Sequence, residues 1–130
     1  MRKVRRFVIQ EHTEGGCVHW DLMLEGGESL SEGNGARESF LETYRVGVPP
    51  DKLGLDVNSA QKIFDHSSKF LNYEGSVKGG TGSVTIAERG TYQLLEEGAD
   101  YRRVMLQGQK LKGCYCLNHI EGNRWRIRKF

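Results

Sequence analysis

The 130-residue chain contains little proline, cysteine or histidine: two, three and four residues respectively. No apolar run approaches the ~20 residues that a membrane-spanning helix needs, so we expect no membrane partner. The first residues are basic, but no apolar stretch follows them as it would in a secretory signal, and a cytoplasmic location is expected. Hydrophobic residues make up 37% and charged residues 28% of the chain, values typical of a single domain spanning residues 1–130.

The three cysteines, Cys17, Cys114 and Cys116, are an odd number, which argues against a framework of disulfide bonds. Cys114 and Cys116 would point to one face of a strand, but a zinc site needs a tighter cluster of ligands. We therefore expect reduced thiols.

The net charge of +2 gives little support for nucleic-acid binding by itself. Basic residues nevertheless cluster at both ends of the chain: Arg2, Lys3, Arg5 and Arg6, then Arg124, Arg126, Arg128 and Lys129. If the two terminal segments pair, they form one basic surface suited to a phosphate backbone. The alternative is an edge strand whose charges protect it from aggregation.

Seventeen glycines fall between short apolar stretches, a pattern typical of short strands joined by turns. Strands are predicted at 6–10, 18–25, 40–46, 83–88, 90–95, 101–106, 113–120 and 124–128. Loops are predicted at 25–35 and 49–58, and turns at 79–82, 89–90 and 121–123. Segment 59–64 is ambiguous, and 40–46 is alternatively the end of a short helix. Seven to nine strands in one small domain predict an all-β fold with a minor helix, either an antiparallel barrel or a sandwich.

Two of the four histidines, His12 and His19, lie seven residues apart, and Asp21 follows two residues after the second. Alternation along a strand places His19 and Asp21 on one face, and Gly15-Gly16 allows the chain to reverse so that His12 returns across from them. Two imidazoles and a carboxylate can hold Mn²⁺, Fe²⁺ or Zn²⁺ with open coordination positions, as metal-activated hydrolysis requires. A hydrogen-bonded surface pair, or the facial triad of an iron oxygenase completed by His66, fits the spacing as well.

Ordered blocks around these residues resemble the 3′-phosphoesterase domain of bacterial DNA ligase D. The blocks are RFVIQEH (6–12), HWDLMLE (19–25), DH (65–66), YEG (73–75), GTGSV (80–84), RGTY (89–92), QKLKG (109–113) and the strand around Trp125. The resemblance implies a small closed antiparallel β-barrel that uses manganese to remove a terminal ribonucleoside and then a 3′-phosphate during DNA repair.

By position, the resemblance implies that His12, His19 and Asp21 are the metal ligands. It also implies that His66 contacts the scissile phosphate and that Gln10 lines the same pocket. The implied partners are DNA 3′ ends, including primer–template ends with a 3′ ribonucleotide. A ligase or polymerase would have to be a separate polypeptide, because the chain contains no motif of either.

Four positions depart from the family pattern: Met23 replaces an arginine, Val48 a lysine, Phe64 an acidic residue and Phe70 a tyrosine. Losing one transition-state donor typically costs ~10²–10³ in rate. Lys62, Lys69 and Arg45 are the cations expected to substitute. The leading hypothesis is a metal-dependent 3′-end phosphoesterase. The alternative is a catalytically weakened module that binds nucleic-acid ends or a partner and keeps the barrel and the metal site.

Overall fold

The computed structural model describes the backbone of residues 4–26, 29–30, 37–38, 40–77 and 82–130, and most of it is β-strand. The strands are β1 (Val4–Glu14), β2 (Cys17–Glu25), β3 (Ser29–Leu30), β4 (Arg37–Glu38), β5 (Phe40–Val46), β6 (Asn58–Ser67), β7 (Gly75–Ser76), β8 (Ser83–Gly98), β9 (Tyr101–Gly108), β10 (Lys112–Glu121) and β11 (Arg124–Lys129). The helical segments of these residues are two 3-10 helices, η1 (Pro50–Lys52) and η2 (Ser68–Leu71). The predicted all-β class is confirmed, whereas the predicted minor helix is represented among these residues by the two short 3-10 segments.

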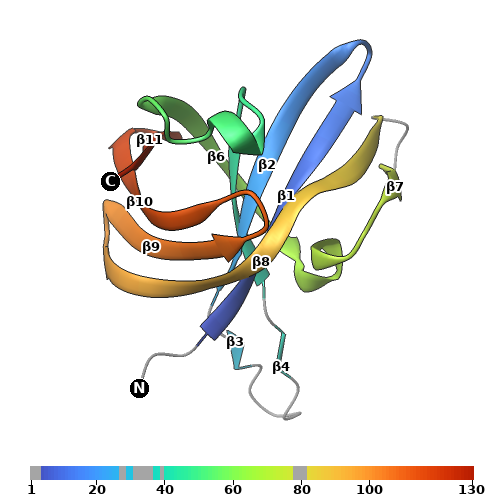
Figure 1. The fold of residues 1–130 in the computed structure, drawn as a ribbon. Helices are drawn as coiled ribbons and strands as arrows, with labels where there is room; N and C mark the ends of the chain where they lie inside the picture. The colour runs from blue at the N-terminus through green and yellow to red at the C-terminus, as the bar shows by residue number, and fades with distance from the viewer. Residues whose placement is uncertain (1–3, 27–28, 31–36, 39, 78–81) are drawn as a thin grey trace.

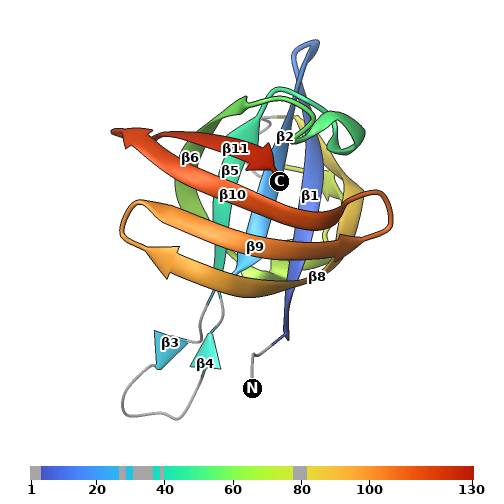
Figure 2. The same ribbon diagram turned by 60° about the vertical axis from the view of Figure 1, so that its left-hand side comes forward.

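Eight of the strands close into a ring of antiparallel neighbours. Their order is β1-β2-β5-β6-β11-β10-β9-β8, and β8 pairs with β1. Strand β7 pairs with one end of β8, and β3 and β4 form a separate small sheet near the start of β1 (Figures 1 and 2). Among the described residues, no helix has the length and apolar character needed to cross a membrane.

The structure corrects three sequence predictions. The terminal segments do not form one basic surface by pairing, because β1 lies between β2 and β8 whereas β11 lies between β10 and β6. The predicted turn at 89–90 is absent, since β8 runs through it. Gly90 instead permits the close approach of β9, because a Cβ there would lie 2.0 Å from the Gln107 carbonyl oxygen. The predicted loop at 25–35 contains β3, whereas residues 31–36 and most of the predicted turn at 79–82 lie outside the described residues.

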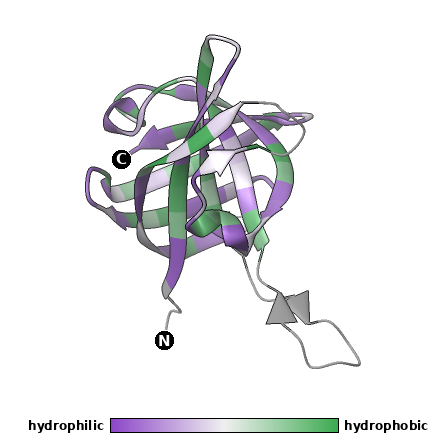
Figure 3. Ribbon diagram, turned by 90° about the vertical axis from the view of Figure 1, so that its right-hand side faces the viewer, coloured by the Kyte–Doolittle hydropathy of each residue, from purple (hydrophilic) through white to green (hydrophobic). Residues whose placement is uncertain are grey.

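The two faces of the ring carry different cores. The inner face holds the main apolar core, whose members include Phe7, Ile9, Leu22, Tyr44, Leu106, Leu117, Trp125 and Ile127. A smaller cluster lies on the outer face of β1, β2 and β5 and packs against η2; it comprises Val8, Met23, Leu41 and Leu71. Figure 3 shows the resulting alternation of hydrophobic and hydrophilic bands along the strands. Strands β1, β2 and β5 therefore have apolar residues on both faces, and the outer face can also bury polar groups.

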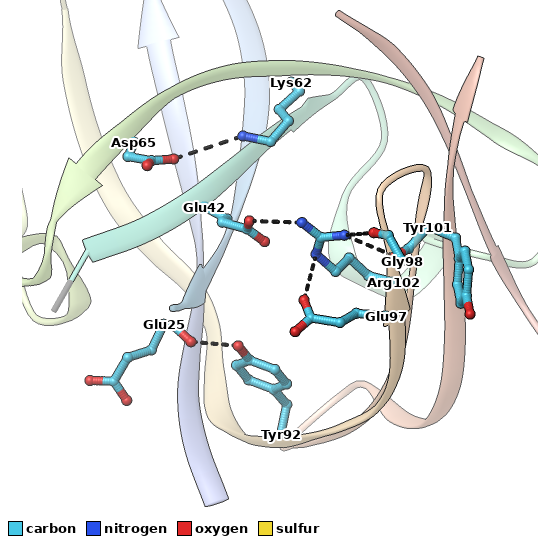
Figure 4. Close-up of polar contacts among 9 residues, drawn as sticks. All are labelled: Glu25, Glu42, Lys62, Asp65, Tyr92, Glu97, Gly98, Tyr101 and Arg102. Carbon is cyan, nitrogen blue, oxygen red and sulfur yellow. Dashed lines mark hydrogen bonds and ion pairs between the residues drawn. The ribbon is translucent and has the colours of Figure 1, made fainter. Parts of the chain in front are cut away.

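The inner face ends in a polar cluster that we call the Arg102 cluster (Figure 4). Arg102 lies 3.3 Å from Glu42 and 3.5 Å from Glu97, and its Nη1 donates hydrogen bonds to the carbonyl oxygens of Gly98 and Tyr101. One guanidinium group thus joins β5, β8 and β9 where the apolar core ends.

The hairpin of β1 and β2 sets the geometry of the candidate site. Gly15 and Gly16 have φ values of 55° and 85°, the positive angles that a two-residue hairpin turn of this kind requires. The turn fixes the register, so that Glu14 pairs with Cys17 and His12 pairs with His19. The predicted return of His12 across from His19 is confirmed.

Candidate metal centre

Neighbouring strands bring the candidate residues to one outer face of the ring. Gln10 pairs with Asp21 across β1 and β2, two positions along from the pair of His12 and His19. On the next strand, Arg45 pairs with Asp21. Side chains of register partners project to the same face of a sheet, and residues two apart on a strand share that face. Strands β1, β2 and β5 therefore gather these side chains on one face, where Gln10 also contacts η2.

His12, His19 and Asp21 converge so that one ligand atom of each lies within 4.8 Å of the others. His12 Nδ1 is 2.8 Å from His19 Nε2, and His19 Nε2 is 3.7 Å from Asp21 Oδ2. Metal–ligand bonds of about 2.1 Å place neighbouring ligand atoms about 3 to 4 Å apart, so the three side chains fit a divalent cation. His12 Nε2 also lies 3.7 Å from a carboxylate oxygen of Glu14, a common outer partner for a metal-binding histidine.

The surroundings favour the neutral, metal-binding form of His19. Burial is the largest influence and lowers the pKa of His19, and the nearby charges of Arg45 and His12 act in the same direction. Asp21 and Glu14 oppose this effect without reversing it. A neutral imidazole keeps a lone pair for a cation, so the site needs little deprotonation before it can bind one.

Arg45 is the cation that contacts this group. Its Nε donates a hydrogen bond to Asp21 Oδ1 at 3.1 Å, while the other carboxylate oxygen of Asp21 faces His19. The Arg45 side chain is 36% exposed, so part of its guanidinium group remains accessible. The sequence named Arg45 as one of three possible substitutes, but its place beside Asp21 comes from the pairing of β2 and β5.

His66 does not join the three converging residues, but it lies on the same side of the sheet. Its Nδ1 is 2.8 Å from Thr43 Oγ1, and the Thr43 hydroxyl donates its proton to the Leu41 carbonyl oxygen at 3.1 Å. In the tautomer in which Thr43 accepts the Nδ1 proton of His66, Nε2 is the acceptor of the neutral ring. Burial lowers the pKa of His66, against the raising effect of Asp21. Sequence reasoning missed Thr43, although it alternates with Arg45 along β5.

Gln10 holds the segment that follows β6. Its buried amide nitrogen donates hydrogen bonds to the carbonyl oxygens of Phe70 and Tyr73, at 3.0 and 3.2 Å. These bonds tie η2 and the residues after it to β1. The structure thus places Gln10 next to Asp21 in the register, with its amide group engaged by backbone.

The four departures from the family pattern lie in different surroundings. Met23 is 1% exposed within the outer apolar cluster, and Val48 packs against the inner core. Phe64 and Phe70 both contact His66. Phe64 stacks on its ring at a centroid distance of 4.7 Å, and Phe70 meets it edge-on at 5.4 Å. The surroundings of His66 are thus more aromatic than the family pattern implies.

The other two candidate cations do not contact the three converging residues within the part of the chain that is described. Lys62 lies 3.8 Å from Asp65, with its Nζ 5.7 Å from the centre of the Tyr44 ring. Lys69 lines a pocket of about 420 Å³ together with Phe70 and Tyr73. Lys69, on η2, therefore adds positive charge on the side of His66 where this pocket lies.

No family model matches the chain. The chain is 28% identical over 134 residues to the multifunctional non-homologous end joining protein LigD of Mycolicibacterium smegmatis, and the alignment covers 92% of the chain and 16% of that relative. It is 29% identical over 127 residues to the LigD proteins of Mycobacterium bovis and Mycobacterium tuberculosis, again over 92% of the chain but 15% of each relative. The chain thus spans less than a fifth of these relatives, and the resemblance to DNA ligase D is confirmed as a distant similarity along most of the chain.

Proposed function

We propose that the protein is a metal-dependent phosphoesterase that processes 3′ ends of nucleic acids in DNA repair. The observation that carries this proposal is the convergence of His12, His19 and Asp21 on the outer face of the sheet. The similarity to end-joining proteins over 92% of the chain supports the choice of substrate. In this proposal the ring of eight strands is the small closed β-barrel that the resemblance implies.

His12, His19 and Asp21 would hold the cation, with manganese as the proposed metal. A divalent cation supplies charge that polarises a phosphoryl oxygen and acidifies water. Arg45 stabilises negative charge on the phosphate with the accessible part of its guanidinium group. Arg45 thereby supplies the positive charge that the family pattern has at the position of Met23.

In this proposal His66 accepts a proton from water, and Gln10 holds η2 in place beside His66. With Nδ1–H held by Thr43, Nε2 of the neutral His66 ring accepts a proton from the attacking water. Gln10 keeps η2 against the sheet and so fixes Phe70 beside His66. We therefore assign His66 a catalytic role and Gln10 a positioning role.

The substrates proposed are DNA 3′ ends that carry a phosphate or a terminal ribonucleotide. Processing leaves a 3′-hydroxyl group for a ligase or polymerase, which in this proposal is a separate polypeptide. Recognition of the strand end needs contacts to phosphate and sugar and little reading of base edges.

The test is manganese-dependent release of phosphate from a 3′-phosphorylated primer–template. His12→Ala and His19→Ala should abolish it, whereas His119→Ala on β10, where the imidazole contacts the Gly122 carbonyl oxygen, should leave it unchanged. Metal binding is read separately: manganese at 100 times its dissociation constant should raise the free energy of unfolding by about 2.7 kcal/mol in the wild type and His119→Ala only. No release from any 3′-modified end at full metal occupancy would refute the proposed activity.

A specific observation also favours a second function, a module that binds metal and nucleic-acid ends without turnover. Met23 and Phe64 stand where the family pattern has an arginine and an acidic residue, and Met23 is packed too closely to accept a charge. Met23→Arg would bury a guanidinium group among apolar side chains, so it should destabilise the fold and not restore activity. Metal-dependent binding of 3′ ends without phosphate release would identify this function.

A further inference from the structure

The most exposed aromatic side chain of the described residues lies beside the candidate centre. Phe64 on β6 is 75% exposed. One face of its ring lies on His66, with the two rings inclined by only 19°. The high exposure means that the opposite face is open to solvent. A phenyl ring held in this way presents a flat apolar surface of fixed orientation.

The stack of Phe64 on His66 restricts the ring without burying it. His66 is itself held by the Thr43 hydroxyl and by the edge contact with Phe70. Phe70 in turn packs against Tyr73, with ring centres 5.6 Å apart. A row of four rings therefore runs across the sheet from the exposed Phe64 to the pocket beside η2.

Positive charge flanks this row of rings. Arg45 lies on the side of the metal centre, two strands from β1, and Lys69 lies at the pocket end. The described structure gives Lys69 no carboxylate partner within ion-pair distance. Cations beside aromatic rings suit a strand of nucleic acid, whose phosphates need positive charge and whose bases stack on π faces. Arg45 pairs with Gln61 on the neighbouring strand, so Phe64 lies three residues, about 10 Å, further along β6. The long arginine side chain and the exposed ring can therefore hold a phosphate and a base of the same strand end.

We propose that Phe64 is a specificity-determining residue that stacks on the unpaired base of the terminal nucleotide, so that the site takes single-stranded or frayed 3′ ends. This inference rests on the proposed function, because it assumes that the strand end lies at the metal centre. A paired terminal base already stacks within its duplex and cannot offer a face to Phe64 without melting the last pair. The ring thus selects unpaired ends without reading which base is present.

The test measures binding, so it does not depend on turnover. The probe is a single-stranded DNA with a fluorescent 5′ label and a 3′-hydroxyl end, which has no phosphate to release, in the presence of Mn²⁺. A second probe carries an abasic 3′-terminal residue. Phe64→Ala should weaken binding of the first probe about tenfold and leave binding of the abasic probe unchanged. Phe64→Trp should bind the first probe at least as tightly as the wild type.

Two control variants and a duplex probe test whether the loss of affinity comes from base stacking on Phe64. Phe130→Ala removes an exposed phenylalanine next to Arg103, at the end of the chain, and should change neither affinity. Phe64→Leu keeps an apolar side chain but removes the π face, so it should behave like Phe64→Ala. On a blunt duplex, Phe64→Ala should have no more than about a twofold effect, because base stacking on the protein contributes only where the base is free.

The outcomes separate this inference from the proposed function. Equal weakening of ordinary and abasic probes by Phe64→Ala, or full affinity of Phe64→Leu, would overturn the stacking role. A tenfold loss confined to the ordinary probe supports it. If that loss occurs in a protein that releases no phosphate, the phosphoesterase proposal fails while the stacking role stands.

Discussion

Two polar groups lie on opposite faces of β5 and differ in how their charges are neutralised. In the Arg102 cluster, on the inner face, Arg102 contacts two carboxylates and donates to two backbone carbonyl oxygens (Figure 4). On the outer face, Asp21 lies between Arg45 and the ring of His19. His12 and His19 present nitrogen atoms to each other at 2.8 Å.

The difference indicates what each group does. In the Arg102 cluster the cation is fully used by protein groups, so it closes the end of the core and has little capacity left for a ligand. The outer group instead brings two imidazoles and a carboxylate together beside one arginine, a set of ligands suited to binding a metal. Substitutions should therefore change stability on the inner face and ligand binding on the outer face.

The largest effect on stability is expected for Arg102→Leu. It leaves Glu42 partly buried without a cation and removes the donors of two carbonyl oxygens, so it should lower the free energy of unfolding by about 3 kcal/mol. The matched change on the outer face, Arg45→Leu, removes a partly exposed arginine from the buried Asp21, whose carboxylate keeps His19 as a neighbour, and should cost less, about 1.5 kcal/mol. Urea unfolding of both variants measures the difference. Equal losses would show that the two arginines play similar structural roles.

A second matched pair tests the ligand side of the comparison. Asp21→Asn removes the charge of the carboxylate from the candidate metal centre and should weaken Mn²⁺ binding at least about 100-fold, more than the usual loss of an outer partner. Glu42→Gln, the corresponding change in the Arg102 cluster, should leave metal affinity unchanged. Isothermal titration calorimetry gives both values directly. A Glu42→Gln protein that loses metal affinity as strongly as Asp21→Asn would contradict the division of roles.

The sequence predicted the parts of the site that depend on local geometry. Alternation placed His19 and Asp21 on one face, and the glycine pair allowed His12 to return beside them. These features depend on one hairpin, whose register follows from its turn. Most strands of the ring were predicted for the same reason, since alternation and glycine-rich turns mark them locally.

The pairing of strands that are distant in the sequence could not be predicted from such local patterns. Arg45 meets Asp21 because β5 pairs with β2, and Thr43 meets His66 because β6 pairs with β5. No local signal distinguishes these partners from other alternating residues. Gly90 misled the prediction for a related reason: a glycine that permits close approach of another strand has the same sequence signature as a glycine in a turn.

A buried carboxylate on β8, that of Glu88, extends the comparison. Glu88 is 3% exposed and accepts hydrogen bonds from the backbone N–H groups of Arg89, Gln109, Lys110 and Leu111, so main-chain donors take the place that an arginine side chain has beside Glu42. Burial acts to raise the pKa of Glu88, but the backbone donors outweigh it and hold the pKa below its ordinary value. Glu88→Gln should therefore lower the free energy of unfolding at neutral pH by about 2 kcal/mol, because an amide cannot accept all of these bonds.

The sign of the pH dependence follows from the lowered pKa. The stabilisation by Glu88 is complete above the ordinary carboxyl pKa and is lost as the pH falls through the lower pKa of the folded state. The difference in unfolding free energy between the wild type and Glu88→Gln should therefore shrink as the pH falls below about 4.5. Urea unfolding from pH 7 down to pH 3 measures it. A difference that stays constant over this range would show that the charge of Glu88 is not what the backbone recognises.

The smallest effect is expected at Tyr44, which lies on the inner face of β5 between Glu42 and Arg45 in sequence. Its ring is fully buried and packs edge-on against Trp125, but its hydroxyl group has no hydrogen-bond partner among the described residues. A buried hydroxyl without a partner costs free energy, so Tyr44→Phe should raise the free energy of unfolding by about 1 kcal/mol. Thermal and urea unfolding of the two proteins measure the change. Destabilisation would mean that the hydroxyl bonds to a trapped water and belongs to the polar network of the Arg102 cluster.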